Sequence, residues 1–402
     1  MTNVYEELGV RTIINVAGIS TRVGGALMPP EVVSAMSEAA KSSVSMTDLQ
    51  AAASRFIATI TGAEAGYVTS GASASLTLGA AAIIAGLDPG LMERLPNTTG
   101  MKNEFVVSRE HRTGYDHAIR VAGGKLTEVG MNEQLSGAGV RRTEVWEFEA
   151  AINSNTVGIL YTATPTSEPP LTSIIKMALK YKLPVLVDAA GQLPPVTNLT
   201  KFIELGADLV AFSGGKGLRG PQSSGILCGR RDYIASVALQ NMDMDEYFDI
   251  WDPPEDFIPK SNIIGIPRHG IGRGFKISKE EIIGLITALK LFSSGKYRPN
   301  YQVQQRYLKL VAKRLTGLKL EPKLIIPKDD QFPLLHIILD TNALKMSGFE
   351  ASRKLKLGAP GVFVSEKLLH ENTLIIHPIN LDDARTEILI EKLIDVLGDN
   401  ER

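Results

Sequence analysis

The sequence predicts an α/β protein with a large, mainly parallel sheet followed by a smaller α+β domain. Its strand-like segments are continuous apolar runs, which is typical of strands buried on both faces of a sheet. Helical patterns separate several of these runs. The chain has 402 residues, which is more than one hydrophobic core usually spans.

The first elements are helical. Pro29 and Pro30 stand at the start of a predicted helix over 30–41, where a missing N–H costs little. A second helix is predicted over 48–61 because its apolar residues recur at helical spacing until Gly62. Residues 65–86 then read as a strand, a turn of small residues and an alanine-rich helix.

The middle of the chain repeats the order of strand and helix. Its predicted strands are 105–108, 157–163, 183–189, 208–213 and 223–229. A helix is predicted over 172–182. Strands of this kind alternating with helices predict a mainly parallel sheet covered on both faces.

The last part of the chain predicts a smaller domain. A long amphipathic helix begins near 279, apolar runs follow at 332–340 and 373–379, and a helix is predicted over 387–397. We therefore expect an N-terminal arm over 1–25, a large domain over 26–275 and a small domain over 276–402.

Composition excludes several classes of function. Lysine and arginine number 43 against 44 aspartates and glutamates. The chain therefore has no surplus of basic residues, and nucleic-acid binding is not indicated. Cys228 is the only cysteine, which excludes an intrachain disulfide and a thiolate-rich metal site, and we expect no metal. The longest apolar stretch, 76–87, is too short to span a membrane, and the N-terminus has no secretory signal. A cytoplasmic protein is expected.

The segment FSGGKGLRGPQ at 212–222 contains a G-x-G-x-x-G spacing. A dinucleotide site needs these glycines after the first strand and before a helix. Here four strands precede the segment and another strand follows it. A P-loop fails as well, because Val210 and Gly217 stand where glycine and a hydroxyl residue are required. Neither nucleotide site is therefore predicted.

Lys216 instead has the setting of a lysine that forms a Schiff base with pyridoxal phosphate. That cofactor needs N–H groups and hydroxyls at a helix N-terminus for its phosphate, a carboxylate for its ring nitrogen and an aromatic ring over its face. The candidates are Ser70, Gly71, Ala72, Ser73 and Ser75 for the phosphate, Asp188 for the nitrogen and His111 for the face. Taken singly, these residues could equally be a solvated loop lysine, two helix caps and a surface histidine.

The order of these candidates along the chain strengthens the prediction. A phosphate turn, a stacking histidine, an aspartate after a strand and a lysine 28 positions later form the order found in fold-type I pyridoxal-phosphate enzymes. Four weak signals in this order favour that class of enzyme and its transferase fold.

The sequence resembles a family that contains bacterial selenocysteine synthase and the D-glucosaminate-6-phosphate ammonia lyases. The likeness covers most of the first 290 residues, through segments that include IINVAG, ITGAEAGYVTSGASAS, LPVLVDAAGQLPP, GADLVAFSGGKGLRGPQSSGILCGRR and HGIGRGFKISKEEIIGL. The resemblance implies that Lys216 is the Schiff-base lysine, Asp188 the pyridinium partner and His111 the ring-facing residue. It also implies cofactor contacts from Ser70 to Ser73 and from Ser213.

Two departures place the chain nearer the ammonia-lyase branch. Selenocysteine synthase has a long N-terminal tRNA-binding extension and an aspartate before the lysine, whereas this chain has about a dozen residues before IINVAG and Gly215 before Lys216. Arg273, with Arg268 just before it, could clamp a substrate carboxylate or phosphate. A charged surface turn explains these arginines equally well.

The expected enzyme is a lyase that abstracts the α-proton of an amino acid or amino-sugar acid and eliminates its β-hydroxyl, which gives a 2-keto acid and ammonia. A racemase or epimerase needs the same first step and is an alternative, as is a selenocysteine synthase-like transferase. A homologue that only holds the cofactor is the non-enzymatic alternative. Fold-type I enzymes normally share active sites between subunits, so a homodimer or a higher homo-oligomer is expected by analogy.

Overall fold

The computed structural model describes residues 4–131, 141–327 and 331–398. The chain divides into two compact units, residues 28–293 and residues 1–27 with 294–402. The domain boundary expected at 275 stays a prediction. In the structure the helix that follows it, α11 (Lys279–Ser293), packs against α2 and α3 of the larger unit.

The larger unit is built on one seven-stranded sheet with the order β2-β8-β7-β6-β5-β3-β4. Its strands are β2 (Ala65–Thr69), β3 (Glu104–Ser108), β4 (Lys125–Val129), β5 (Thr156–Thr162), β6 (Val185–Asp188), β7 (Leu209–Ser213) and β8 (Gly225–Gly229). β8 runs antiparallel to β2 and β7, and the other neighbours pair in parallel. β2 and β7 therefore point the same way, and the carboxyl ends of β2, β7, β6, β5 and β3 meet at one edge of the sheet.

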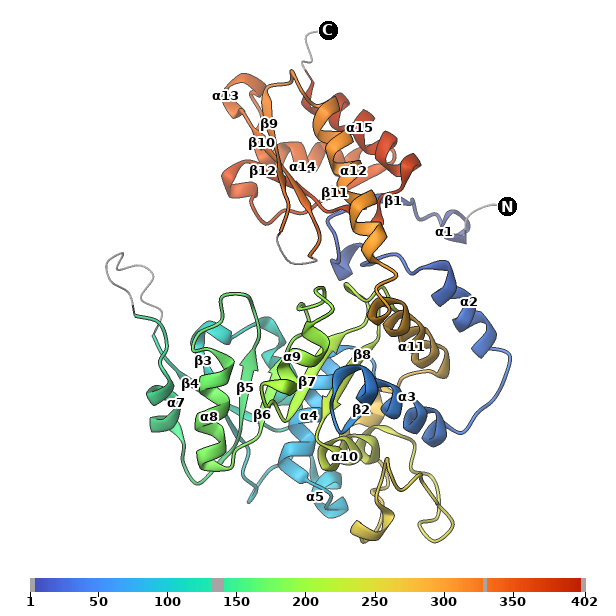
Figure 1. Cartoon of the computed structure of the whole chain (residues 1–402), viewed down its shortest axis with the longest axis vertical. Helices are drawn as coiled ribbons and strands as arrows, with labels where there is room; N and C mark the ends of the chain where they lie inside the picture. The colour runs from blue at the N-terminus through green and yellow to red at the C-terminus, as the bar shows by residue number, and fades with distance from the viewer. Residues whose placement is uncertain (1–3, 132–140, 328–330, 399–402) are drawn as a thin grey trace. The chain divides into compact units, whose positions relative to one another are not determined.

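Helices cover both faces of this sheet (Figure 1). They are α2 (Pro30–Ala39), α3 (Met46–Thr61), α4 (Ala72–Ala85), α5 (Pro89–Arg94), α6 (His117–Val121), α7 (Val145–Ala151), α8 (Leu171–Tyr181), α9 (Asn198–Glu204), α10 (Arg231–Asn241) and α11. α4 is apolar on all sides and almost wholly buried, because it contacts strands β2 and β5–β8 on one side and α6 and α10 on the others.

The smaller unit has two separate sheets. The first segment of the chain contributes α1 (Val4–Glu7) and β1 (Ile13–Val16), and β1 pairs in parallel with β11 (Gly361–Val364). The second sheet has the order β12-β10-β9 and is antiparallel, with β9 (Leu320–Ile325), β10 (Leu334–Leu339) and β12 (Thr373–Ile376). The helices are α12 (Arg298–Arg314), α13 (Thr341–Leu344), α14 (Gly348–Leu357) and α15 (Asp383–Leu397).

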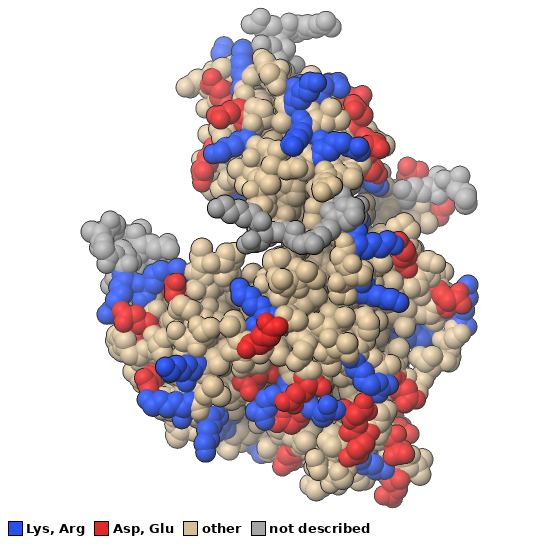
Figure 2. All heavy atoms as spheres, viewed as in Figure 1, with Lys and Arg blue, Asp and Glu red and all other residues tan. Residues whose placement is uncertain are grey.

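Side chains of both charges are intermixed on the surface. On the face shown in Figure 2, basic and acidic residues of the larger unit lie close to one another. Among the described residues, no helix is both long enough and apolar enough to cross a membrane.

Candidate active site

Lys216 lies in a tight loop between β7 and β8. The loop is closed by hydrogen bonds from Gly214 N to Ser224 O at 2.8 Å and from Gly220 N to Gly214 O at 2.9 Å. A Cβ added at Gly217 would lie 2.1 Å from Leu193 O, so this glycine is required by the close approach of two backbones. Backbone crowding therefore explains at least part of the glycine spacing.

Gly215 is required for a similar reason. A Cβ at this position would lie 2.6 Å from Gln222 Cα on the other side of the loop. The glycines on both sides of Lys216 thus hold the loop in one compact backbone conformation. They fix the position of the Lys216 backbone, from which the side chain extends.

Asp188 ends β6, the strand beside β7. It is only 9% exposed, and its Oδ1 accepts a hydrogen bond from Ala190 N at 3.0 Å. Burial raises the pKa of the Asp188 carboxyl, the Ala190 N–H and the positive charge of Lys216 oppose this rise, and the charge of Asp116 adds to it. Lys216 and Asp188 therefore lie close enough to interact electrostatically at one edge of the sheet.

His111 follows β3 in a short 3₁₀ turn, Arg109–His111. Its backbone carbonyl accepts a hydrogen bond from Thr162 Oγ1 at 2.8 Å, and Thr162 stands opposite Asp188 in the β5–β6 register. The imidazole is 3% exposed and meets the ring of Tyr161 edge-on, with centroids 4.5 Å apart. The fold thus brings the segments of Lys216, Asp188 and His111 to the same edge of the sheet.

The predicted phosphate turn lies between β2 and α4. Gly71 has φ of 124°, a conformation that favours glycine, and it forms the N-cap of the helix. The N–H groups of residues 72–74 have no hydrogen-bond partner within the described residues, whereas Ser75 N donates to Gly71 O at 2.9 Å. A helix N-terminus with free N–H groups attracts an anion.

This turn reaches the edge that carries Lys216 through β8. A Cβ at Gly225, the first residue of β8, would lie 2.5 Å from the carbonyl carbon of Gly71, so the two backbones touch. Ser213, which ends β7, is the register partner of Gly225. The Ser70 hydroxyl donates a hydrogen bond to Phe275 O at 2.9 Å, so in this structure it is bonded to segment 273–281.

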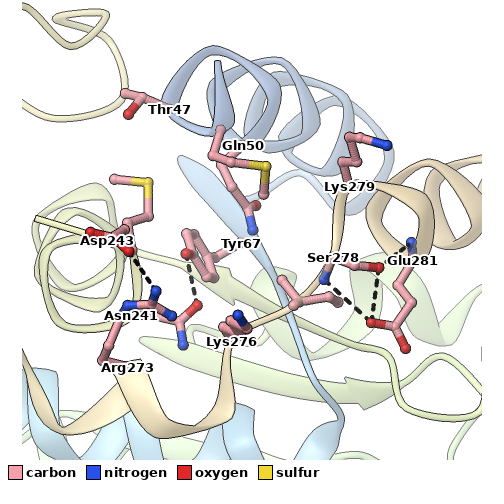
Figure 3. Close-up of a pocket in the computed structure, with 13 residues that line it drawn as sticks. Thr47, Gln50, Tyr67, Asn241, Asp243, Arg273, Lys276, Ser278, Lys279 and Glu281 are labelled. Atoms are coloured by element: carbon pink, nitrogen blue, oxygen red, sulfur yellow. Dashed lines mark hydrogen bonds and ion pairs between the residues drawn. The ribbon is translucent and has the colours of Figure 1, made fainter. Parts of the chain in front are cut away.

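A pocket of about 510 Å³ is lined by Asn241, whose Nδ2 donates to Phe275 O at 3.4 Å (Figure 3). Residues of α3, β2, the end of α10 and segment 273–281 line it. Its inner wall is held by Asn241, whose Nδ2 donates to Gly272 O at 2.8 Å and whose Oδ1 accepts from the buried hydroxyl of Tyr67 at 2.9 Å. This rigid wall connects the pocket with the strand that leads into the phosphate turn.

The two predicted arginines lie in different surroundings. Arg273 lines the pocket, where its guanidinium pairs with Asp243. Arg268 is an exposed residue whose backbone N–H donates to Glu93 Oε1 at 2.8 Å, and it does not line this pocket. The structure therefore brings only Arg273 to the pocket.

Sequence reasoning missed two residues of this region. Lys276 lines the pocket and makes no salt bridge within the part of the chain that the structure describes. The spacing R-x-x-K from Arg273 was the available signal. Asp116, buried and paired with Arg112, raises the pKa of Asp188, and no sequence pattern marked it.

Comparisons with known proteins match this architecture. The chain is 27% identical to D-glucosaminate-6-phosphate ammonia lyase of Salmonella typhimurium over 98% of both chains. It is 28% identical to 5'-C-glycyluridine monooxygenase-decarboxylase of Streptomyces over 98% of this chain and 92% of that protein. L-seryl-tRNA(Sec) selenium transferase of Aquifex aeolicus is 24% identical over 92% of this chain and 81% of its own.

Solved structures confirm the predicted fold-type I pyridoxal-phosphate enzyme fold. A structure of D-glucosaminate-6-phosphate ammonia-lyase superposes with a TM-score of 0.81 at 25% identity, covering 99% of this chain and all of that one. A cysteine desulfurase of Thermococcus onnurineus shares the fold, with a TM-score of 0.53 at 16% identity over 96% and 94% of the two chains.

The family itself is identified by a match over more than half of the chain. Residues 13–245, which include the phosphate turn, His111, Asp188 and Lys216, match the family SelA, described as L-seryl-tRNA selenium transferase. The resemblance stated from the sequence is thereby confirmed, and the chain belongs to the SelA family.

Proposed function

We propose that this protein is a pyridoxal-phosphate-dependent lyase. It removes the α-proton of an amino acid or amino-sugar acid, eliminates the β-hydroxyl and releases a 2-keto acid and ammonia, as the name of the Salmonella relative implies for that enzyme. The observation that carries the proposal is the convergence of Lys216 and Asp188 at the ends of neighbouring strands, beside a free helix N-terminus. Full-length likeness to the ammonia lyase supports it.

The residues present fit pyridoxal phosphate. The N–H groups of residues 72–74, with the Ser73 hydroxyl, would hold the phosphate dianion at the N-terminus of α4. Burial disfavours a charge on Asp188 when it stands alone, which suits a carboxylate that gains a cationic ring nitrogen as its partner. Lys216 would hold the cofactor covalently, and Ser213 and His111 complete the set.

Bound pyridoxal phosphate supplies an electron sink for the carbanion formed at Cα. Asp188 would keep the proton on the ring nitrogen through its carboxylate. Lys216 Nζ would take the α-proton once the substrate amine has displaced it. Asp188 would therefore stabilise the positive charge on the ring nitrogen, and Lys216 would carry the α-proton.

The pocket that contains Arg273 and Lys276 would receive an anionic group. Lys276 and Arg273 line it, and Arg273 would have to exchange Asp243 for the ligand. Arg268 could join them after a movement or serve the site of a neighbouring subunit. A cytoplasmic homodimer, or a higher homo-oligomer, accommodates both arrangements.

A monooxygenase-decarboxylase is the second candidate function. The Streptomyces relative of that name is 28% identical to this chain, and the ammonia lyase is 27% identical, each over 98% of this chain. It would use the same lysine, aspartate and phosphate turn, so the site does not separate the two reactions. A racemase, a selenocysteine synthase-like transferase and a homologue that only holds the cofactor complete the alternatives.

The test is a panel of D- and L-amino acids and phosphorylated amino-sugar acids, incubated with protein and cofactor in deuterated water. Keto acid and ammonia together support the lyase. Recovered, inverted and α-deuterated substrate without ammonia would identify a racemase, and oxygen uptake with release of carbon dioxide would identify the second candidate. A cofactor absorbance band that no substrate changes would indicate a binding homologue.

Lys216→Ala tests the central residue, with the exposed Lys201→Ala as its control. We expect Lys216→Ala to abolish the band that borohydride fixes and to lower turnover by about 10²–10⁴-fold. Retention of both the band and full activity would refute the proposal.

A further inference from the structure

The segment 108–116, which carries His111, is firmly held. Almost all of its polar side chains have partners in the structure. Arg109 and Arg112 both contact Glu128, and Arg112 also pairs with Asp116. Glu110 accepts hydrogen bonds from Thr143 N and Arg142, and the Ser108 hydroxyl contacts that of Thr143. The Thr113 hydroxyl accepts a hydrogen bond from Tyr115 N. The imidazole of His111 differs, because neither ring nitrogen has a hydrogen-bond partner within the described residues.

This imidazole is also buried, at 3% exposed. A buried polar atom without a partner destabilises the folded state, so two of them on one ring require an explanation. A ring needed only as a flat surface could be phenylalanine or tyrosine without that cost. The two unpaired nitrogens therefore indicate a hydrogen bond that a bound ligand completes.

The backbone of His111 fixes where such a bond can form. Thr162 Oγ1 ties the His111 carbonyl to the strand position opposite Asp188, and Asp188 interacts electrostatically with Lys216. A turn of the side chain away from Tyr161 would present a ring nitrogen to the group bound at this edge of the sheet. Glu110 and Arg112, on either side, are already committed to other partners.

We propose that a ring nitrogen of His111 donates a hydrogen bond to the β-hydroxyl oxygen of the substrate and protonates it as it leaves. This inference rests on the proposed lyase function. It assigns to His111 the step that separates elimination from racemisation, since both reactions begin with removal of the α-proton.

The step balances in bonds and protons. Lys216 takes the α-proton, the Cα–H electron pair forms the Cα–Cβ double bond, and the Cβ–O bond breaks with its pair on oxygen. The His111 N–H gives its proton to that oxygen, and water leaves. The other ring nitrogen takes up one proton from solvent, so the imidazole stays neutral and changes its tautomer. This proton taken from solvent balances the α-proton that Lys216 now holds.

A neutral imidazole can donate the hydrogen bond to the hydroxyl oxygen, and it gives up its proton only as the other ring nitrogen takes one up. Burial lowers the pKa of His111 to about 4, and Arg142 reinforces this effect, whereas Glu110 and the nearby backbone of Glu168 oppose it. The ring is therefore neutral near pH 7, with one donor and one acceptor, as a hydroxyl group also has. A substrate carboxylate would instead favour a charged partner such as an arginine.

His111→Phe tests the proposal because it keeps a flat ring and removes both nitrogens. His117→Phe is the matched control, since His117 is exposed and its Nδ1 lies 3.0 Å from Arg120 Nη2. Each protein is incubated with pyridoxal phosphate and D-glucosaminate 6-phosphate in deuterated water. Cofactor dissociation constant, α-deuteration of recovered substrate and formation of keto acid are measured.

We expect His111→Phe to keep the cofactor dissociation constant and the rate of α-deuteration within about threefold, and to lower keto-acid formation by about 10²-fold or more. Unchanged keto-acid formation would show that stacking suffices and overturn the proposal. An equal loss of both rates would overturn it as well, because the residue would then serve the α-proton step. If the wild type neither deuterates nor eliminates any substrate, the proposed lyase function itself fails.

A second measurement decides the case if His111→Phe does not fold. The wild type is labelled with ¹⁵N-histidine and titrated with serine and with alanine, in both enantiomers, in the presence of the cofactor. We expect the His111 ring resonances to move with a serine enantiomer and to stay in place with the matching alanine, which lacks the hydroxyl. Equal shifts with both amino acids, or no shift with either, would overturn the proposal.

Discussion

Replacing Asp188 by asparagine should make the cofactor-free protein more stable and the enzyme inactive. Asp188 is 9% exposed, and the net effect of its surroundings is a raised pKa, so burial outweighs the attraction of Lys216. Asparagine keeps the shape and still accepts the hydrogen bond from Ala190 N. Removing the buried charge should raise the free energy of unfolding by about 1–2 kcal/mol.

The pH dependence of this gain has a defined sign. A raised native pKa means that the folded protein binds the Asp188 proton more tightly than the unfolded chain does. The wild type therefore loses stability as pH rises from the ordinary carboxyl range, near ~4, to the raised native pKa. The difference in stability between Asp188→Asn and wild type should grow over that window and then stay constant.

Thermal unfolding of the cofactor-free proteins from pH 4 to 8 measures this difference. For a domain of this size, 1 kcal/mol corresponds to a shift in Tm of about 2–4 °C. Asp208→Asn is the matched control, because burial raises the pKa of Asp208 as well, yet this residue precedes β7 and pairs with Arg230. The control should keep cofactor affinity and turnover.

With pyridoxal phosphate present, the wild type should be more stable than Asp188→Asn. The cofactor gives Asp188 a cationic partner, so it should stabilise the wild type more than Asp188→Asn. Turnover of the variant should fall by about 10²-fold or more. An Asp188→Asn protein that is no more stable than the wild type without cofactor, or fully active with it, would refute the reasoning.

Two further substitutions test the pocket and the lysine loop. Lys276→Ala should raise the KM for a phosphorylated substrate about 10–100-fold with little change in cofactor affinity, because a charged hydrogen bond contributes about 1.5–3 kcal/mol. Lys260→Ala is the control. An unchanged KM in Lys276→Ala would show that the pocket does not bind the substrate. Gly217→Ala should lower the free energy of unfolding by roughly 1–3 kcal/mol, since its Cβ would lie 2.1 Å from Leu193 O, whereas Gly274→Ala meets nothing within 4 Å. Equal denaturant midpoints for these two glycine variants would contradict this reading of the loop.

The strands that could be predicted are those buried on both faces. Segments such as 105–108 and 208–213 are apolar without interruption, and the structure has strands there. The strand β4 (Lys125–Val129) was missed, because Lys125, Thr127 and Glu128 interrupt its apolar pattern. β4 lies at the edge of the sheet, where polar side chains reach water, so a strand of this kind leaves a weak signal.

Pairing between distant segments was also beyond the sequence. β1 and β11 are separated by more than 340 positions and form a parallel pair, although each is only four residues long. Nothing in either segment specifies its partner. Their register depends on the burial of Ile14, Val16 and Val362 in the core of the smaller unit.

By itself, the sequence determined the fold class, the family and the order of Lys216, Asp188, His111 and the phosphate turn, because local patterns and chain order record these features. Only the tertiary structure decided what each residue faces. It placed Arg273 and Lys276 on one pocket and left Arg268 outside it. It also showed that His111 is buried without a partner. Hydrogen bonding and burial depend on neighbours from distant segments, and one-dimensional spacing carries no record of those neighbours.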